Sequence, residues 1–187
     1  MSISGYAEIM KNGMVRPQDI SEFAGRIYDE ASRLTSLVQD IIEISKLDEK
    51  SGEMPFENVD IYEIAQDICQ NLTLQSKKKN ITLSIEGSNV EIYGVRHILY
   101  EMCYNLVDNA MKYNREGGYV KVSLSTTEDH VCFTVEDNGI GIAKEEQERI
   151  FERFYRVDKS HSRKTGGTGL GLSIVKHGCM YLGAKVD

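Results

Sequence analysis

Four polar side chains recur at steps of four, four and three residues in the segment YEMCYNLVDNAMKYN: Glu101, Asn105, Asn109 and Lys112. A helix would place all four on one face, opposite an apolar face. Asparagine is costly inside a helix because its side chain competes for backbone hydrogen bonds, so two asparagines one turn apart invite a functional reason. Carboxamide oxygens suit Mg²⁺, and a lysine binds phosphate as a point charge. The spacing therefore indicates a magnesium and phosphate site, or else a polar helix face in contact with solvent.

A second phosphate signal is the stretch GGTGLGLS (Gly166–Ser173), in which four glycines fall within six residues. Bare backbone lets amide N–H groups approach an anion, and a helix N-terminus adds its dipole. The stretch lacks the Lys-Ser/Thr pair of a P-loop, and it has neither the preceding strand nor the GxGxxG spacing of a dinucleotide-binding fold. Basic residues lie just upstream: Arg156, Lys159, Arg163 and Lys164. The pattern is typical of an anion site, and equally of a flexible surface loop.

The third segment is VEDNGIGI (135–142), where a predicted strand ends at Asp137 and an Asn-Gly turn follows. A carboxylate at a buried strand end is costly unless it has a partner, and the amino group of adenine is a suitable donor. The glycines would let a flat base lie close to the backbone. The same sequence is also typical of an ordinary Asn-Gly turn that closes the strand and binds no ligand.

The apolar pattern predicts the elements that position these segments. Residues 60–187 read as an α+β domain, with a mixed or mostly antiparallel sheet and helices on one face. The expected elements are a helix from the N-cap Asp60 to Leu72, strand 81–86, helix 95–113, strands 119–127 and 130–137, helix 145–154 and a helix from about Leu170 to Leu182. Residues 49–59 read as a linker with a glycine and a proline.

Residues 1–48 read as two helices separated by a turn at Asn12-Gly13, with Pro17 opening the second helix. The second helix carries a heptad-like stripe: Ile20, Ala24, Ile27, Ala31, Leu34, Val38, Ile41 and Ser45. Leu37 and Ile44 widen it. Such a hairpin has too small a core to stand alone, so pairing with a second copy as a four-helix bundle is favoured over packing on its own chain.

Composition narrows the function classes. A net charge of -7 argues against nucleic acid as the main partner. The apolar runs are too short to cross a bilayer. The four cysteines contain no CxxC pair and are expected to be reduced and buried, and the four histidines show no metal-ligand spacing, so no zinc site is predicted.

In order and spacing, these segments resemble the catalytic and ATP-binding domain of sensor histidine kinases of two-component systems. The N box is similar to NLVDNAMKYN, the G1 box to DNGIGI, the F box to FERFYRVD and the G2 box to GGTGLGLSIV, and the resemblance covers about residues 54–183. SISGYAEIM resembles the segment that follows the phosphoacceptor box, and LVQDIIEISKLDE resembles the second helix of the dimerisation domain. The resemblance implies a Bergerat-type ATP-binding sandwich preceded by a dimerising helical hairpin.

The resemblance also implies residue roles. Asn109 would ligate Mg²⁺ with support from Asn105, Lys112 would contact phosphate, and Arg156 would reach the γ-phosphate. The loop from Asp158 to Thr165 would close over ATP as a lid. The residues implied to line the adenine pocket are Tyr113, Asp137, Gly139, Gly141 and Ile142. Those implied to hold the phosphates are Gly167, Thr168, Gly169, Leu170 and Gly171.

A kinase of this family would transfer the γ-phosphoryl group of ATP to a histidine and onward to an aspartate of a response regulator. No histidine precedes His97, so we expect the phosphoacceptor to be missing from 1–48 and the last strands of the sheet to be missing after GAKVD. This chain alone would then not phosphorylate itself. The resemblance implies a homodimer in the cytoplasmic portion of a bacterial sensor, anchored in the membrane only through segments absent from the chain.

Other functions fit the same fold. ATPases such as gyrase, the heat-shock chaperone and mismatch-repair proteins carry a glutamate one turn before the magnesium-binding asparagine, where this chain has Asn105. Glu101 lies a further turn away, so a base that activates water is absent where hydrolysis needs it. Serine kinases that regulate sigma factors lack the long hairpin. A nucleotide-binding or dimerising module without activity in isolation is the remaining alternative.

Overall fold

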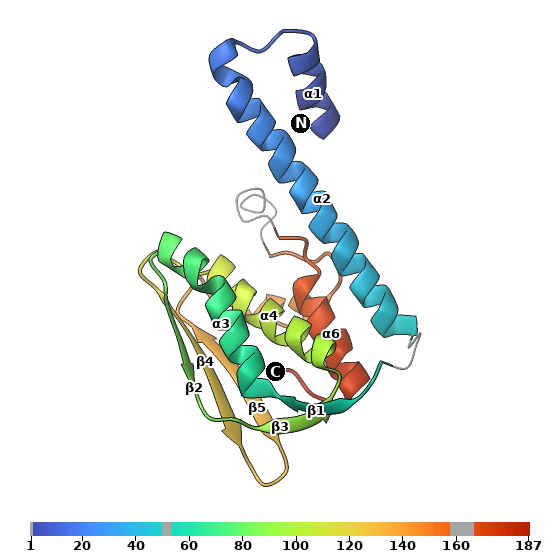
Figure 1. The fold of residues 1–187 in the computed structure, drawn as a ribbon, viewed down its shortest axis with the longest axis vertical. Helices are drawn as coiled ribbons and strands as arrows, with labels where there is room; N and C mark the ends of the chain where they lie inside the picture. Colours follow the sequence, from blue (N-terminus) through green and yellow to red (C-terminus); the bar gives the residue numbers. More distant parts are fainter. Residues whose placement is uncertain (1, 50–53, 158–166) are drawn as a thin grey trace.

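The computed structural model describes residues 2–49, 54–157 and 167–187. A long helical hairpin leads into an α+β domain in which α3 (Ile61–Lys78) and α4 (Arg96–Lys112) lie over one face of a sheet (Figure 1). A further helix of this domain, α6 (Gly171–Leu182), packs beside α4. The predicted fold class, a mixed sheet with helices on one face after a helical hairpin, is confirmed.

The hairpin consists of α1 (Ile3–Lys11) and α2 (Ile20–Glu49), as predicted. Ser2 caps α1 by accepting a hydrogen bond from the backbone of Gly5 at 3.3 Å. Pro17 opens a short 3₁₀ turn that leads into α2, because its fixed φ suits the first turn of a helix. The two helices meet through an edge-to-face contact between the rings of Tyr6 and Phe23, whose centroids lie 5.5 Å apart.

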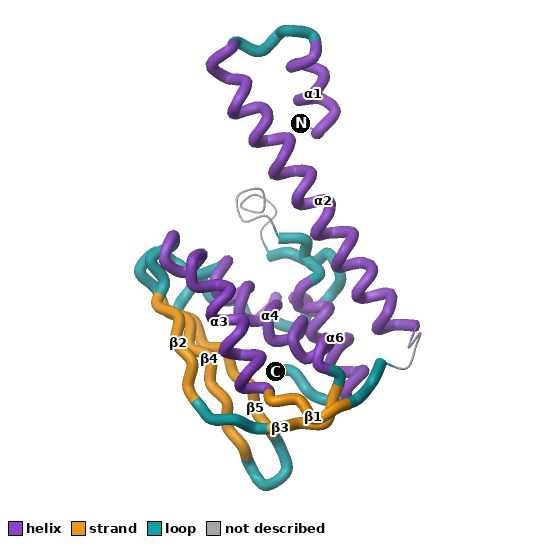
Figure 2. Tube along the Cα trace, viewed as in Figure 1, coloured by secondary structure: helices purple, strands orange, loops and turns teal. Residues whose placement is uncertain are grey.

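The main sheet is mixed, with strand order β2-β4-β5 among the described residues (Figure 2). Its strands are β2 (Thr82–Glu86), β4 (Tyr119–Thr126) and β5 (Val131–Asp137). The β2–β4 pair is parallel and the β4–β5 pair is antiparallel, with Val122 opposite both Ile85 and Val135. This arrangement brings the start of β4 and the end of β5 close to the C-terminal end of α4.

A second, two-stranded ladder was not predicted. Strand β1 (Glu57–Asp60) pairs antiparallel with β3 (Glu91–Gly94). The first of these lies mostly in the segment assigned to a linker, and that assignment is wrong for Glu57 onward. Both strands are four residues long and largely exposed, so they show too little apolar alternation to be recognised.

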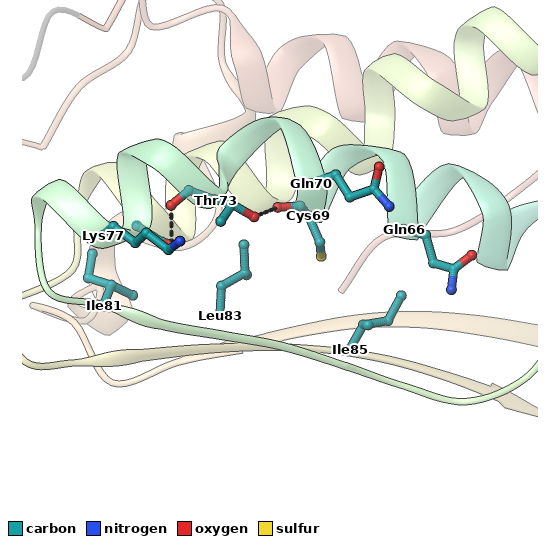
Figure 3. A pocket seen from close by; sticks show the side chains of 9 residues that line it. Gln66, Cys69, Gln70, Thr73, Lys77, Ile81, Leu83 and Ile85 are labelled. Atoms are coloured by element: carbon teal, nitrogen blue, oxygen red, sulfur yellow. Dashed lines mark hydrogen bonds between the residues drawn. The ribbon is translucent and has the colours of Figure 1, made fainter.

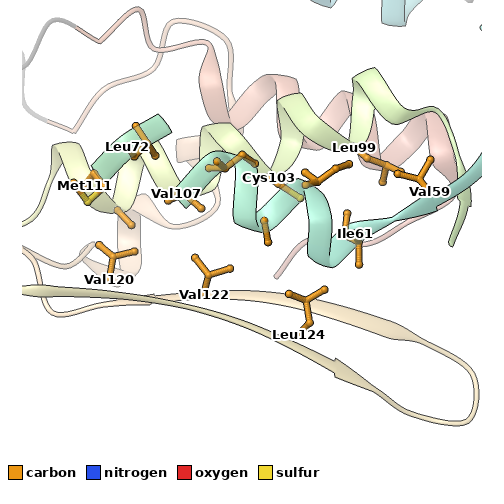
Figure 4. Close-up of a cluster of buried hydrophobic side chains, with 14 of the residues drawn as sticks. Val59, Ile61, Leu72, Leu99, Cys103, Val107, Met111, Val120, Val122 and Leu124 are labelled. Atoms are coloured by element: carbon orange, nitrogen blue, oxygen red, sulfur yellow. The ribbon is translucent and has the colours of Figure 1, made fainter. Parts of the chain in front are cut away.

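The core lies between α3, α4 and β4 (Figure 4). Fully buried side chains meet there from the three elements: Ile64 and Ile68, Val107 and Met111, and Val120 and Val122. Asp60 caps α3, as predicted, by accepting hydrogen bonds from the backbone of Tyr62 and Glu63. Because the apolar face of α4 packs into this core, its polar face is turned toward α6 and the glycine-rich segment.

The helix predicted for 145–154 is wrong. The chain instead forms two short 3₁₀ turns, Lys144–Glu146 and Arg149–Phe151. Phe154 then adopts a positive φ of 63° and donates its backbone N–H to the carbonyl of Gly169 at 2.9 Å. A continuous α-helix would not allow this left-handed residue, so the contact with the glycine-rich segment overrides the helical pattern.

A second apolar cluster joins α2 to the α+β domain. Ile44 and Leu47 of α2 are buried against residues of α4 and α6: Val95, Ile98, Leu170 and Ile174. The prediction that Ile44 widens the heptad stripe is therefore wrong, because Ile44 belongs to a separate face of α2. The stripe itself stays exposed, with Val38 at 53% and Ile41 at 41%.

The four cysteines are free thiols, but the expectation that all are buried is wrong, because Cys132 is exposed. Burial, with a smaller contribution from Cys179, raises the pKa of the Cys103 thiol to about 12. We expect iodoacetamide at about pH 8 to modify Cys132 in the folded protein and to modify Cys103 about a thousandfold more slowly, since only the thiolate reacts. Mass spectrometry of digested protein checks this. Equal labelling in the native and guanidinium-unfolded protein would contradict the buried position of Cys103.

Candidate nucleotide-binding site

The polar face of α4 begins with Asn105, which is fixed by two neighbours. Its amide nitrogen donates to the carbonyl of Glu101 at 2.8 Å. Its amide oxygen lies 2.5 Å from the position that a Cβ of residue 171 would occupy, so a side chain there would displace the Asn105 amide. Asn105 thus joins the polar face of α4 to the first residue of α6, which brings two of the predicted segments together.

Asn109 lies one turn further along α4, is half-buried, and has no side-chain hydrogen bond among the residues that the structure describes. Its carboxamide oxygen is therefore available to a metal ion. Within the described ranges no group of three His, Cys, Asp or Glu side chains could hold a metal alone. This set of donors fits Mg²⁺, which takes few protein oxygens and completes its shell with phosphate oxygens and water.

Lys112 forms an ion pair with Asp108, with Nζ and Oδ2 at 2.6 Å. Asp108 is buried, with 7% of its surface exposed, and sequence reasoning missed it. The signal was present, because an acid four residues before a lysine on a helix is a common stabilising pair. A buried carboxylate holds the Lys112 ammonium at the end of α4, where a phosphate would meet it.

Asp137 begins the turn that follows β5. One of its carboxylate oxygens accepts from the backbone N–H of Gly139 at 2.7 Å, and the side chain is exposed rather than buried, contrary to prediction. Gly139 lies against the carbonyl of Tyr113 at the end of α4, and Ile140 donates its N–H to the same carbonyl at 3.2 Å. The structure thus places Tyr113, Asp137 and Gly139 side by side.

Two asparagines that sequence reasoning missed hold this turn. Asn138 accepts from the backbone N–H of Tyr119 at 2.7 Å, and Asn114 donates to the carbonyl of Tyr119 at 2.9 Å. Gly118 lies between the two side chains, with no room for a Cβ. The signal for Asn114 was its position beside a glycine turn, where asparagine side chains bond to nearby backbone, whereas the partner of Asn138 lies 19 residues away.

The glycine-rich segment closes the other side of the site. Gly169 has a φ of +77° and its would-be Cβ lies 3.0 Å from the backbone of Phe154. Arg156 donates from Nη1 to the carbonyl of Gly167, and the hydroxyl of Tyr113 lies 3.4 Å from the position of a Cβ on Gly167. Arg156, Tyr113 and Gly167 are therefore neighbours, as a site shared by the predicted segments requires.

Thr168 is held by hydrogen bonds and Leu170 by apolar packing. The Thr168 hydroxyl accepts from the N–H of Leu170 at 3.3 Å and donates to Asp40 of α2 at 2.5 Å. Leu170 is fully buried in the cluster below α2. Gly171 follows as the first residue of α6. The backbone of this segment therefore has a fixed position beside the polar face of α4.

Two predicted adenine-pocket residues are not brought into contact. Gly141 has a φ of +69° and nothing within 4 Å of a would-be Cβ. Ile142 is 46% exposed, and its carbonyl accepts from the side chain of Gln147 at 3.3 Å. The predicted lid from Asp158 to Thr165 lies outside the described residues.

Two cavities lie outside the candidate site. One of about 430 Å³ opens between α3 and β2 and is lined in part by Gln66, Cys69 and Leu83 (Figure 3). Another of about 450 Å³ is lined by residues near the start of α4, including Val95 and Tyr100. No predicted site residue lines either of these two cavities.

Comparison with known proteins identifies two families. Residues 94–187 match the family described as histidine kinase-, DNA gyrase B-, and HSP90-like ATPase, which implies ATP binding, and residues 1–50 match the His Kinase A (phospho-acceptor) domain. The chain is 34% identical over 177 residues to the sensor-like histidine kinase SenX3 of Mycolicibacterium smegmatis. That match covers 94% of this chain and 46% of the relative, so the chain spans less than half of the relative's length.

Solved structures agree. The histidine kinase AdeS of Acinetobacter baumannii has the same fold, with a TM-score of 0.77 at 20% identity over 96% of this chain and 82% of that chain. The histidine kinase ThkA, solved in complex with the response regulator protein TrrA, matches with a TM-score of 0.68 at 25% identity over 82% of this chain and 46% of that chain. Among the helices that the structure describes, none combines the length and apolar character that crossing a membrane requires. The chain belongs to the sensor histidine kinase family.

Proposed function

We propose that this chain is the ATP-binding kinase core of a two-component sensor, which transfers the γ-phosphoryl group of ATP to a histidine and onward to an aspartate of a response regulator. One observation carries the proposal. The polar end of α4 meets the glycine-rich backbone, with Asn105 against Gly171 and Tyr113 beside Gly167. The response regulator as partner is supported by the ThkA complex, in which a relative binds one.

The chain would act mainly by positioning charge. The ammonium of Lys112 and the guanidinium of Arg156 attract phosphates, and the N–H groups of Gly169 and Gly171 at the start of α6 would bind them, while the N–H of Leu170 donates to Thr168. When bound at Asn109, Mg²⁺ would neutralise phosphate charge. Asn105 has an amide where an ATPase needs a carboxylate, so it cannot take a proton from water. The site therefore favours phosphoryl transfer over hydrolysis.

The acceptor histidine must come from outside the hairpin described here, because residues 1–50 include none. Anchoring in a membrane through further segments stays a prediction from the family.

The test of the proposed function is calorimetric titration with a non-hydrolysable ATP analogue, with and without Mg²⁺. We expect saturable binding that Mg²⁺ strengthens and slow phosphate release from ATP. Absence of binding at millimolar analogue would contradict the proposal, and rapid hydrolysis would favour the ATPase alternative.

We propose further that the hairpin dimerises through the exposed stripe of α2. The chain does not cover Leu34, Val38 or Ile41 itself, which supports a second copy rather than intramolecular packing. We expect Val38→Asp to convert a dimer to a monomer, measured by sedimentation equilibrium. Gln39→Asp, an equal change at an exposed neighbour, is expected to leave the dimer intact. A monomeric unmodified chain at high concentration would contradict this interface.

A further inference from the structure

An acidic side chain of the hairpin reaches the predicted phosphate segment. Asp40 of α2 accepts a hydrogen bond from the Thr168 hydroxyl at 2.5 Å, across 128 residues of sequence. Figure 1 shows α2 passing beside α6, and residues of the two helices are in contact. Thr168 lies between Gly167 and Gly169, so the carboxylate is placed at the same backbone that is proposed to hold phosphates.

The charged groups around Asp40 bear on how its carboxylate would affect a bound phosphate. Its carboxylate interacts favourably with Lys112 and unfavourably with Asp108, and it adds to the negative field at Glu101. Burial is the largest influence on Asp40 and raises its pKa, against the lowering effects of Thr168 and Lys112. Lys112 is ion-paired with Asp108 and also attracts the Asp40 carboxylate, so a phosphate bound at Lys112 would meet the negative charge of Asp40.

We propose that Asp40 couples the position of α2 to nucleotide binding: its carboxylate holds α2 on Thr168 and repels the phosphates of ATP, so that docking of α2 and binding of ATP oppose each other. This inference rests on the proposed ATP binding. It follows from the shared site, because a partly buried carboxylate and a triphosphate cannot both approach Lys112 and Thr168 without mutual repulsion.

Among the described residues, the other contacts of α2 bring no carboxylate to the phosphate segment, and only apolar packing reaches it, at Leu170. Leu47 packs in the apolar cluster, Glu43 meets His97 at 3.0 Å, and Asp48 meets Arg153 at 2.5 Å. These contacts hold α2 against the catalytic domain whether or not phosphates are present. Asp40 is therefore the contact that makes docking sensitive to nucleotide, and by linkage the effect must be reciprocal.

Asp40→Asn tests the charge, because asparagine can still accept from Thr168. We expect the variant to bind a non-hydrolysable ATP analogue about fivefold more tightly at low salt, with a smaller gain at about 0.5 M salt. Adenosine, which lacks phosphates, is expected to bind the variant and the unmodified chain equally. Asp29→Asn, the same change at an exposed position of α2, is the matched control and is expected to change neither affinity.

The outcomes separate the two proposals. Equal affinity of the analogue for Asp40→Asn and the unmodified chain would overturn the coupling while leaving ATP binding intact, and so would an equal gain for adenosine. Absence of analogue binding in every variant would overturn the proposed function and the coupling together.

The docking of α2 on the catalytic domain can be measured without an assay of kinase activity. Spin labels at exposed positions of α2 and α6, introduced as Tyr28→Cys and Met180→Cys in a background where Cys69 and Cys132 are serine, report the distance between the helices. In the spin-labelled chain that keeps Asp40, we expect the ATP analogue to shift the distribution of distances between the two labels. With Asp40→Asn added, we expect a smaller shift. An unchanged distribution in the unmodified chain at saturating analogue would overturn the coupling.

Discussion

Asn109→Ala is expected to lower the affinity for ATP in the presence of Mg²⁺ by about a hundredfold and to abolish the difference between titrations with and without the metal. The Asn109 carboxamide is half-buried and makes no hydrogen bond within the described parts of the chain, so its removal breaks no hydrogen bond of the described fold. Thermal unfolding is therefore expected to change little. Calorimetric titration and a thermal melt of the same sample measure both effects.

Asn105→Ala is the matched control, because it removes the same side chain one turn earlier. Here the amide is committed to the carbonyl of Glu101 and packs on Gly171. We expect a loss of about 1 kcal/mol in unfolding free energy and a smaller loss of affinity, with the dependence on Mg²⁺ retained. If Asn109→Ala keeps that dependence, the metal role of Asn109 is wrong.

Sequence periodicity predicts most of the fold because the long elements each bury one face. The apolar positions of α3 and α4, and the alternation of β4, appear in the sequence as repeats that match what the core buries, from Ile64 to Val122. The ladder of β1 and β3 could not be found in this way, since it buries little. The 145–154 segment has a helical pattern, but the contact of Phe154 with Gly169 determines its conformation.

The site is predictable only where its residues are close in sequence. The face of Asn105 and Asn109 follows from helical spacing, and Asp108 could have been found as the partner of Lys112 from the same spacing. Asn138 and Asp40 are different. Their partners, Tyr119 and Thr168, lie 19 and 128 residues away, and only the folded chain brings them together.

Gly139→Ala is expected to lower the free energy of unfolding by about 2–3 kcal/mol and to weaken ATP analogue binding by at least about tenfold, since the adenine side of the site would shift. A Cβ at this position would overlap the carbonyl of Tyr113 and lie 2.8 Å from a carboxylate oxygen of Asp137. The Tyr113 carbonyl is backbone and already accepts from Ile140, so it cannot move aside without breaking the turn. Denaturant unfolding and calorimetric titration measure the two effects.

Gly141→Ala provides the contrast within the same turn. Nothing lies within 4 Å of a would-be Cβ there, so the only cost is the positive φ of 69°. That cost is about 1 kcal/mol for a residue other than glycine, and we expect at most a small change in affinity, because the added Cβ would meet open space. If the two variants bind the analogue equally well, the close approach of Gly139 to Tyr113 does not shape the nucleotide site, and the turn after β5 serves only to end the strand.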